Sequence, residues 1–219
     1  MKLICFFLLS LTPLSVFAGN SAPERLFLAL GDSYTIGESV AEGARWPNQL
    51  ADALNRKGVK VAKPKIIAAT GWRTDDLKDA LSSEALKNEY DLVSLLIGVN
   101  NQYRGKSVDD YAIEFEDLLL TVIQLAKGKK ENVFVVSIPD YGFTPFGESE
   151  QQDISKEIDT FNAINHVITQ KHAINYIDIT DISREGLKDT SLLADDGLHP
   201  SRKMYGLWTE RMTMALNIR

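Results

Sequence analysis

Five short apolar runs, separated by segments of helical periodicity, constrain the fold of this chain more than any other feature. The runs cover residues 26–30, 65–69, 92–97, 133–138 and 174–178. Strands that are apolar on both faces are typical of a parallel sheet covered by helices on both sides. The sequence therefore predicts about five buried, parallel strands.

Helical spacing of apolar residues fills the intervals between the runs. The clearest helix is predicted over 108–126, with Ser107 as its N-cap, and Ser201 is placed to cap the last helix. The remaining predicted helices cover about 47–57, about 75–89, 154–168 and 204–215. Alternation of strands and helices over 219 residues, with no internal repeat or linker, predicts one three-layer α/β domain with a mostly parallel sheet.

The first eighteen residues have the composition of a secretory signal. Lys2 precedes a nearly unbroken apolar run over 3–11, and small residues at positions 16 and 18 suit cleavage after Ala18. A membrane anchor is the alternative, but the run is short for a span, which needs about 20 residues. We therefore expect a signal peptide over 1–18, a mature domain over 19–219 and a periplasmic or extracellular location.

Composition excludes several classes of function. The net charge of −6 and the lack of a basic stripe argue against a nucleic-acid partner. The single cysteine, Cys5, lies in the predicted signal, so the mature chain has no thiol, disulfide or cysteine metal site. Neither His166 nor His172 pairs with another ligand at metal-binding spacing, and no phosphate-binding glycine loop occurs. We expect no metal and no cofactor.

Four short segments carry residues with catalytic chemistry, and most follow predicted strands. They are Gly31-Asp32-Ser33-Tyr34, Gly71, Gly98-Val99-Asn100-Asn101 and Asp196-Gly197-Leu198-His199. In open parallel sheets, ligands bind beyond the carboxyl ends of the strands, so these segments are expected to meet in one crevice. They supply a hydroxyl nucleophile, amide donors and an acid–base pair, which acyl transfer through a serine ester requires.

In these four segments, which occur in the right order over nearly all the mature chain, the sequence resembles the SGNH hydrolases, also called GDSL-type esterases and lipases. The resemblance implies a flavodoxin-like α/β/α sandwich. It also implies that Ser33 is the nucleophile, His199 the general base and Asp196 the residue that orients His199. The backbone amides of Ser33 and Gly71 and the side chain of Asn100 would form the oxyanion hole.

One position departs from the family pattern. The third segment usually ends in an acid, and Asn101 stands there instead. The oxyanion donor Asn100 is intact, so the departure concerns a supporting interaction. Thr35 takes the place of the last glycine of Gly-x-Ser-x-Gly, which argues against the ordinary α/β-hydrolase elbow, and Asp32 is expected to shape the nucleophile turn.

Each of these residues also has a purely structural interpretation. Ser33 could be a helix N-cap, Gly71 a turn glycine, Asn100 part of an ordinary turn, Asp196 a turn cap and His199 a surface histidine. The four segments together favour the catalytic interpretation.

Aromatic residues on predicted loops are the candidates for substrate binding. We expect contacts from Tyr34, Trp72, Tyr103 and Tyr141. Further candidates at the rim are Phe143, Phe146, Arg73 and Arg104, and simple loop packing is the alternative for every one of them. The segment 141–152 has no clear periodicity and is expected to form a mobile loop over the site.

Three functions are consistent with this pattern. The first is an exported serine esterase acting on lipid-like or short-chain acyl esters, including lysophospholipids, through an acyl-enzyme on Ser33. The second is a carbohydrate O-acetylesterase, and the third is a catalytically silent binding protein on the same fold. The expected partner is a small-molecule, lipid or saccharide ester, with no nucleic acid and no membrane span after signal cleavage.

Overall fold

A five-stranded parallel sheet forms the centre of the computed structural model, which describes residues 23–216 and residue 218. The predicted signal peptide over 1–18 lies outside the described residues. The strands are β1 (Phe27–Gly31), β2 (Lys65–Ala68), β3 (Leu92–Leu96), β4 (Val133–Val136) and β5 (Asn175–Ile177). Their order is β2-β1-β3-β4-β5 and every pairing is parallel, which confirms the five predicted strands.

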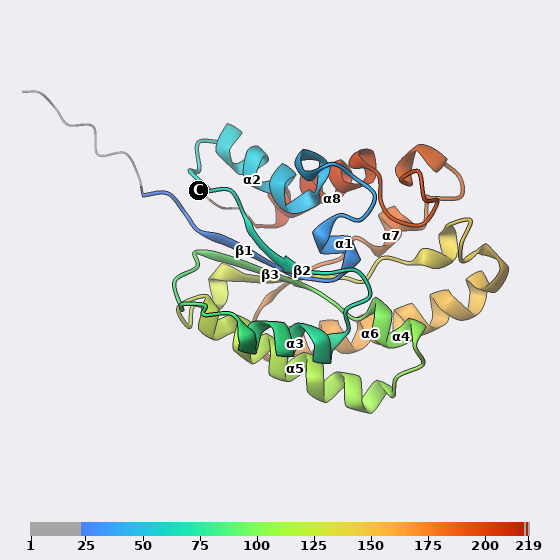
Figure 1. The fold of residues 1–219 in the computed structure, drawn as a ribbon, viewed down its shortest axis with the longest axis horizontal. Coiled ribbons are helices and arrows are strands. Elements are labelled where there is room, and N and C mark those ends of the chain that lie inside the picture. The colour runs from blue at the N-terminus through green and yellow to red at the C-terminus, as the bar shows by residue number, and fades with distance from the viewer. Residues whose placement is uncertain (1–22, 217, 219) are drawn as a thin grey trace, which may run out of the picture.

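Helices cover both faces of this sheet, as Figure 1 shows. On one face lie α2 (Trp46–Arg56) and α8 (Arg202–Ala215), and on the other lie α3 (Thr74–Ser83), α5 (Val108–Leu125) and α6 (Gln151–Lys171). The short helices are α1 (Ser33–Ile36), α4 (Val99–Tyr103) and α7 (Thr180–Ser183). The three-layer α/β/α sandwich is therefore confirmed. Within the described ranges, no helix is both long and apolar enough to cross a membrane.

Helix ends follow the capping chemistry of the sequence in two places and depart from it in a third. The Ser107 hydroxyl accepts from the Asp110 amide, and the Ser201 hydroxyl accepts from the amides of Lys203 and Met204, as predicted. The helix expected over about 75–89 ends at Ser83. The hydroxyls of Ser82 and Ser83 donate to backbone carbonyls one turn earlier in the helix, and such bonds weaken a helix. The predicted helix end, which rested on the apolar pattern, was therefore too far along the chain.

Continuous apolar strands produce a core that fills both sides of the sheet. Every residue of β1, β3 and β4 is buried. The rings of Phe27, Trp46 and Phe134 pack with centroids 6.3 Å apart in each pair, joining β1, α2 and β4. Helices on both faces explain why these strands lack a polar side.

The strand order determines where a ligand can bind. The chain moves outward from β1 to β2 and then returns to the other side of β1 as β3. Gly31 at the end of β1 is paired in register with Leu96 at the end of β3. The segments after these two strands therefore emerge side by side at the topological switch point, where flavodoxin-like sheets form their binding crevice.

The segment 141–152, predicted to be irregular, forms two 3₁₀ turns, Tyr141–Phe143 and Glu148–Glu150, and the start of α6. Asp140 anchors the start of this segment. The buried Asp140 carboxylate accepts hydrogen bonds from the Gly142 amide (2.9 Å), Ser155 Oγ (2.7 Å) and Arg184 Nε (2.9 Å). Closure of this loop over a substrate stays a prediction.

Candidate active site

A tight turn after β1 presents Ser33. Gly31 has no room for a side chain, since an added Cβ would lie 2.3 Å from the Leu96 carbonyl oxygen and from Thr35 Oγ1. Asp32 caps α1 by accepting the Tyr34 amide at 3.0 Å, which confirms its expected role in shaping the turn. Ser33 is the first residue of that helix, and a first helical amide has no acceptor within its own helix. The backbone amide of Ser33 is therefore free of helical bonding.

Asp196 and His199 form a close pair in the turn before α8. Asp196 Oδ2 lies 2.7 Å from His199 Nδ1, and Oδ1 accepts the backbone amides of Leu198 and His199, each at 2.9 Å. Gly197, at φ 66°, permits the turn that brings both side chains to the same side. The three-residue spacing noted in the sequence thus produces a direct contact.

The Asp196 carboxylate sets the protonation pattern of His199. Partial burial raises the pKa of Asp196, but hydrogen bonds from Ser39, His199 and two backbone amides outweigh this and hold that pKa well below its usual range. An ionised carboxylate only accepts hydrogen bonds, so the neutral imidazole carries its proton on Nδ1. Nε2 is then the unprotonated nitrogen that can act as a base.

Ser39 is a residue of the site that the sequence did not reveal. Its hydroxyl donates to Asp196 Oδ2 at 2.5 Å, across a separation of 157 positions. It does so from a left-handed backbone conformation, with φ 61°, which is unfavourable for a residue with a side chain. No motif marks a serine in a loop, so only the folded chain identifies this contact.

Replacing Ser39 with alanine is expected to lower kcat by up to ~10-fold with little change in KM, because a hydrogen bond to a charged group contributes about 1.5 kcal/mol. Steady-state kinetics on a p-nitrophenyl ester measures the effect. Ser39→Gly removes the same bond but relieves the left-handed strain. Ser39→Gly should therefore show the same loss of kcat. Its free energy of unfolding should be about 1 kcal/mol higher than that of Ser39→Ala. Wild-type kcat in both variants would remove Ser39 from the site.

Gly71 and Asn100, the expected oxyanion donors, line the same cavity as Ser33. Gly71 adopts φ 81° in the turn after β2, and Asn100 lies in α4, which begins directly after β3 and Gly98. Asn100 Nδ2 donates one hydrogen to the Trp72 carbonyl oxygen at 3.0 Å. An amide nitrogen has two hydrogens, so the second remains available to a ligand.

One cavity of about 180 Å³ brings the expected catalytic residues together. Its wall includes Ser33, Gly71, Asn100 and His199. Asp196 stands behind His199 through the Nδ1 contact. The four sequence segments therefore converge on a single crevice at the carboxyl ends of β1 and β3, as the parallel sheet implied.

Aromatic side chains line the same cavity. Tyr34, Tyr103 and Tyr141 lie on its wall, together with Phe146, whereas Trp72 is not among the lining residues. The Trp72 ring packs against the core, and Trp72 meets the site through its carbonyl group. Its neighbour Arg73 is paired with Asp75. Four of the aromatic side chains noted in the sequence thus line the cavity.

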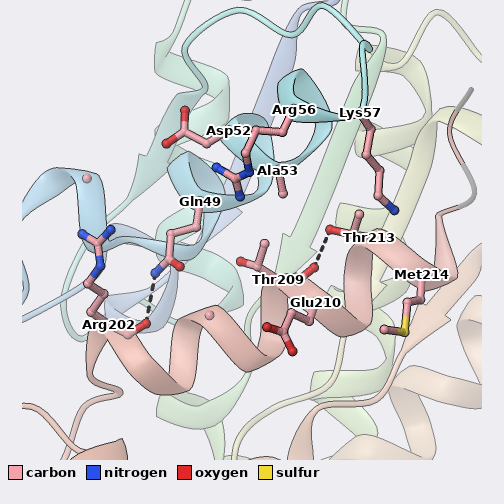
Figure 2. Close-up of a pocket in the computed structure, with 12 residues that line it drawn as sticks. Gln49, Asp52, Ala53, Arg56, Lys57, Arg202, Thr209, Glu210, Thr213 and Met214 are labelled. Carbon is pink, nitrogen blue, oxygen red and sulfur yellow. Dashed lines mark hydrogen bonds between the residues drawn. The ribbon is translucent and has the colours of Figure 1, made fainter.

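A larger depression of about 420 Å³ lies between α2 and α8, away from these residues (Figure 2). Its rim carries charges of both signs, among them Arg56, Arg202 and Glu210. Gln49 on α2 donates a hydrogen bond to the Arg202 carbonyl oxygen at the start of α8, which stabilises the α2–α8 contact. The Thr213 hydroxyl donates to the Thr209 carbonyl oxygen within α8. This larger depression is not the candidate active site, because none of the four segments reaches it.

In the part of the chain that the structure describes, no cluster of three or more histidine, cysteine or acidic residues could hold a metal ion.

Asp32 is fully buried beneath the nucleophile turn. Burial raises its pKa to about 7, because desolvation outweighs the hydrogen bond from the Tyr34 amide. Its second oxygen, Oδ2, has no hydrogen-bond partner. The unfolded value is about 4, so the folded chain binds this proton more tightly. The resulting stabilisation is complete below about pH 4 and is lost as the pH rises through about 7.

Asp32→Asn is therefore expected to flatten the fall in the free energy of unfolding between pH 4 and pH 8. Asparagine keeps the acceptor for Tyr34 and, like the protonated acid, places a neutral donor at the Oδ2 position. The variant should match the wild type at pH 4 and exceed it by a few kcal/mol at pH 8, at about 1.4 kcal/mol per pKa unit. Denaturant titrations at both pH values measure this, and parallel pH profiles for the two proteins would contradict it.

Comparison with solved structures identifies the same fold in other proteins. The acetylxylan esterase Axe2 from Geobacillus stearothermophilus superposes with a TM-score of 0.70 at 19% identity, covering 89% of this chain and 95% of that one. TesA superposes with a TM-score of 0.65 at 16% identity, covering 88% and 98%. A lipolytic protein of the G-D-S-L family from Veillonella parvula has a TM-score of 0.62 at 15% identity, covering 86% and 96%. These similarities establish the fold.

Sequence comparison establishes the family. No curated protein gave a significant match to the chain. The model of the GDSL-like lipase/acylhydrolase family matches residues 29–207, a range that contains all four candidate segments. The chain therefore belongs to the GDSL-like lipase/acylhydrolase family and is a carboxylic ester hydrolase.

Proposed function

We propose that this protein is an exported serine esterase that cleaves carboxylic esters through an acyl-enzyme on Ser33. The observation that carries the proposal is one cavity lined by Ser33, Gly71, Asn100 and His199, with Asp196 bonded to Nδ1 of the His199 ring. A serine hydroxyl is a weak nucleophile unless a base takes its proton, and His199 is the base on that wall.

Acylation follows from this arrangement. Ser33 Oγ attacks the ester carbonyl carbon while His199 Nε2 takes the hydroxyl proton, and Asp196 stabilises the resulting imidazolium. The carbonyl oxygen becomes an oxyanion, which accepts hydrogen bonds from the amides of Ser33 and Gly71 and from Asn100 Nδ2. Collapse of the tetrahedral intermediate breaks the ester bond, and the imidazolium protonates the departing alkoxide.

Deacylation repeats the same steps with water. His199 Nε2 takes a proton from a water molecule as its oxygen attacks the acyl carbon. The second tetrahedral intermediate breaks the bond to Ser33 Oγ, which regains its proton from His199 and releases the carboxylic acid. The residues need no external reductant, oxidant or nucleotide.

A fluorophosphonate probe tests this mechanism directly, because it reacts only with an activated serine. Mass spectrometry of the labelled protein is expected to place the phosphonyl group on Ser33 alone, and a p-nitrophenyl butyrate substrate should slow the labelling. A label on a different serine, or a folded protein that takes no label, would refute the assignment.

The aromatic side chains beside Ser33 support an apolar acyl group as the substrate's recognised part. Tyr103 is 58% exposed, Phe146 is 53% exposed and Tyr141 is buried, yet the three ring centroids lie 6.1–6.2 Å from one another. Exposed rings clustered at a cavity mouth are typical of a binding surface. Lipid-like and short-chain acyl esters, including lysophospholipids, are the substrates that such a surface suits.

The length of the acyl chain tests whether the aromatic rings bind the acyl group. Phe146→Ala is expected to lower kcat/KM for p-nitrophenyl octanoate by ~10-fold and to leave the acetate nearly unchanged, because the longer chain loses a buried contact. Ile113→Ala is the matched control, since Ile113 is 71% exposed on α5 and outside the cavity. Equal effects of the two variants on the octanoate would contradict an acyl site at the rings.

A carbohydrate O-acetylesterase is the second candidate, supported by the small cavity and by the acetylxylan esterase named among the similar structures. The same rings would then stack on a sugar face while an acetyl group fills the cavity. Activity confined to acetyl esters, with acetylated xylo-oligosaccharides preferred over lysophospholipids, would select this candidate. Turnover of octanoyl esters and lysophospholipids would select the first.

Export rests on the N-terminal sequence, in which Lys2, the apolar run over 3–11 and the small residue Ala18 have the order of a cleaved signal. Expression of the full chain in a bacterial secretion host is expected to yield a protein outside the cytoplasm whose N-terminus is Gly19. Recovery of the enzyme only in the cytoplasm with Met1 or Lys2 at its end would contradict it.

A further inference from the structure

Asn101, which stands where the family usually has an acid, is a buried side chain whose amide oxygen and nitrogen both form hydrogen bonds. It is 2% exposed. Its Oδ1 accepts the Thr74 backbone amide at 3.1 Å, and its Nδ2 donates to Thr74 Oγ1 at 2.6 Å. Because a backbone amide can only donate, it must face Oδ1, and this fixes which end of the Asn101 amide meets the hydroxyl.

The chain of hydrogen bonds continues in one direction only. Thr74 Oγ1 accepts from Asn101, so its own hydrogen points elsewhere, and it donates to Glu114 Oε2 on α5. Position 101 has no acid, but the carboxylate of Glu114 on α5 lies one hydrogen bond beyond Thr74. Since Thr74 has one hydroxyl hydrogen, it cannot serve an aspartate at 101 and Glu114 together.

The same contacts connect the two segments that carry oxyanion donors. Asn100 donates to the Trp72 carbonyl oxygen, and the adjacent Asn101 bonds to Thr74. Gly71 directly precedes this bonded stretch of chain. Two consecutive asparagines therefore join the turn after β2 to the start of α4, which sets the separation between the Gly71 amide and Asn100 Nδ2.

We propose that Asn101, Thr74 and Glu114 form a positioning relay that holds the two oxyanion donors in place, with Glu114 in the role of the missing third-segment acid. The proposal rests on the proposed function, because it assigns its purpose through Gly71 and Asn100. None of the three relay residues lines the cavity. They are positioning residues, and their effect should fall on kcat, since oxyanion donors act on the transition state.

The direction of the relay supplies its test. In Asn101→Asp, two carboxylates compete for one hydroxyl hydrogen, and kcat is expected to fall by ~10- to 100-fold with KM within about twofold of the wild type. In the double variant Asn101→Asp/Glu114→Gln the direction reverses: the glutamine amide donates to Thr74 Oγ1, and Thr74 donates to the new aspartate. This variant should recover most of the lost kcat.

Two further measurements keep the outcome interpretable. Rates are referred to active sites titrated with the fluorophosphonate probe, so misfolded protein does not count as lost catalysis. Glu116→Gln is the matched control on the same helix, because Glu116 bonds to Lys171 and His172 and not to the relay; it should retain the wild-type kcat. If Asn101→Asp does not fold, the pair Thr74→Ser and Thr74→Val replaces it, with kcat retained by serine and lost with valine.

The relay is overturned if Asn101→Asp keeps the wild-type kcat, if the double variant is no better than Asn101→Asp, or if valine at 74 performs as well as serine. A structural role alone would lower the fraction of titratable sites and leave kcat per site unchanged, which also counts against it. A different result would show that the proposed function is wrong: Ser33→Ala would keep its turnover, whatever the relay variants do.

Discussion

Ser33→Ala should lose ester hydrolysis almost completely, with kcat for p-nitrophenyl butyrate reduced by ~10⁴-fold or more. Without Oγ there is no bond to form with the acyl carbon, and the remaining donors can only assist attack by water. The fold should be unaffected, because the side chain that caps α1 belongs to Asp32. Stopped assays over hours, with thermal unfolding on the same samples, measure both quantities.

Ser82→Ala is the matched control for this loss. The Ser82 hydroxyl bonds only to a helix carbonyl on α3, far from the cavity, so the variant should keep the wild-type kcat. If Ser33→Ala keeps its turnover, or if it still takes the fluorophosphonate label, another residue is the nucleophile.

Asn100→Ala has the second largest expected effect, a fall in kcat of ~10²- to 10³-fold with KM near that of the wild type. The oxyanion exists only along the reaction path, so the donor stabilises the transition state more than the bound ester. The variant also loses the bond to the Trp72 carbonyl, which adds to the loss through the placement of Gly71. Full kinetic curves on the acetate and the butyrate separate kcat from KM.

Asn48→Ala provides the control for this substitution. Asn48 donates to the Glu42 carbonyl at the start of α2, outside the cavity, and its loss should leave both kinetic parameters unchanged. A rise in KM with a normal kcat for Asn100→Ala would assign Asn100 to ground-state binding, and unchanged kinetics would remove it from the site.

Prediction from the sequence succeeded where the signal is local. The apolar runs predicted all five strands, and the caps at Ser107 and Ser201 were correct because capping depends on a few neighbouring residues. The end of α3 was wrong by several residues, since the helical pattern continued past Ser83 while the chain turned back toward β3. Helix ends depend on tertiary bonds that a periodic pattern does not contain.

The candidate site divides in the same way. Four motifs identified Ser33, Gly71, Asn100 and the Asp196–His199 pair, because acyl transfer requires these groups in a recognisable local setting. Ser39 carries no motif, and its bond to Asp196 exists only because two distant loops meet. Trp72 was expected to offer its ring to the substrate, but the ring packs on the core and the carbonyl group serves the site.

The sequence by itself determined the class of fold, the family and the candidate catalytic residues, because apolar periodicity and motifs depend on residues that are close together in the chain. Only the tertiary structure decided how those parts are held. The strand order places the ends of β1 and β3 together, the hydroxyl of Ser39 reaches Asp196, and Thr74 joins Asn101 to Glu114. The physical reason is that hydrogen bonds depend on distance in space, and separations of tens of residues along the chain leave that distance undetermined until the core packs.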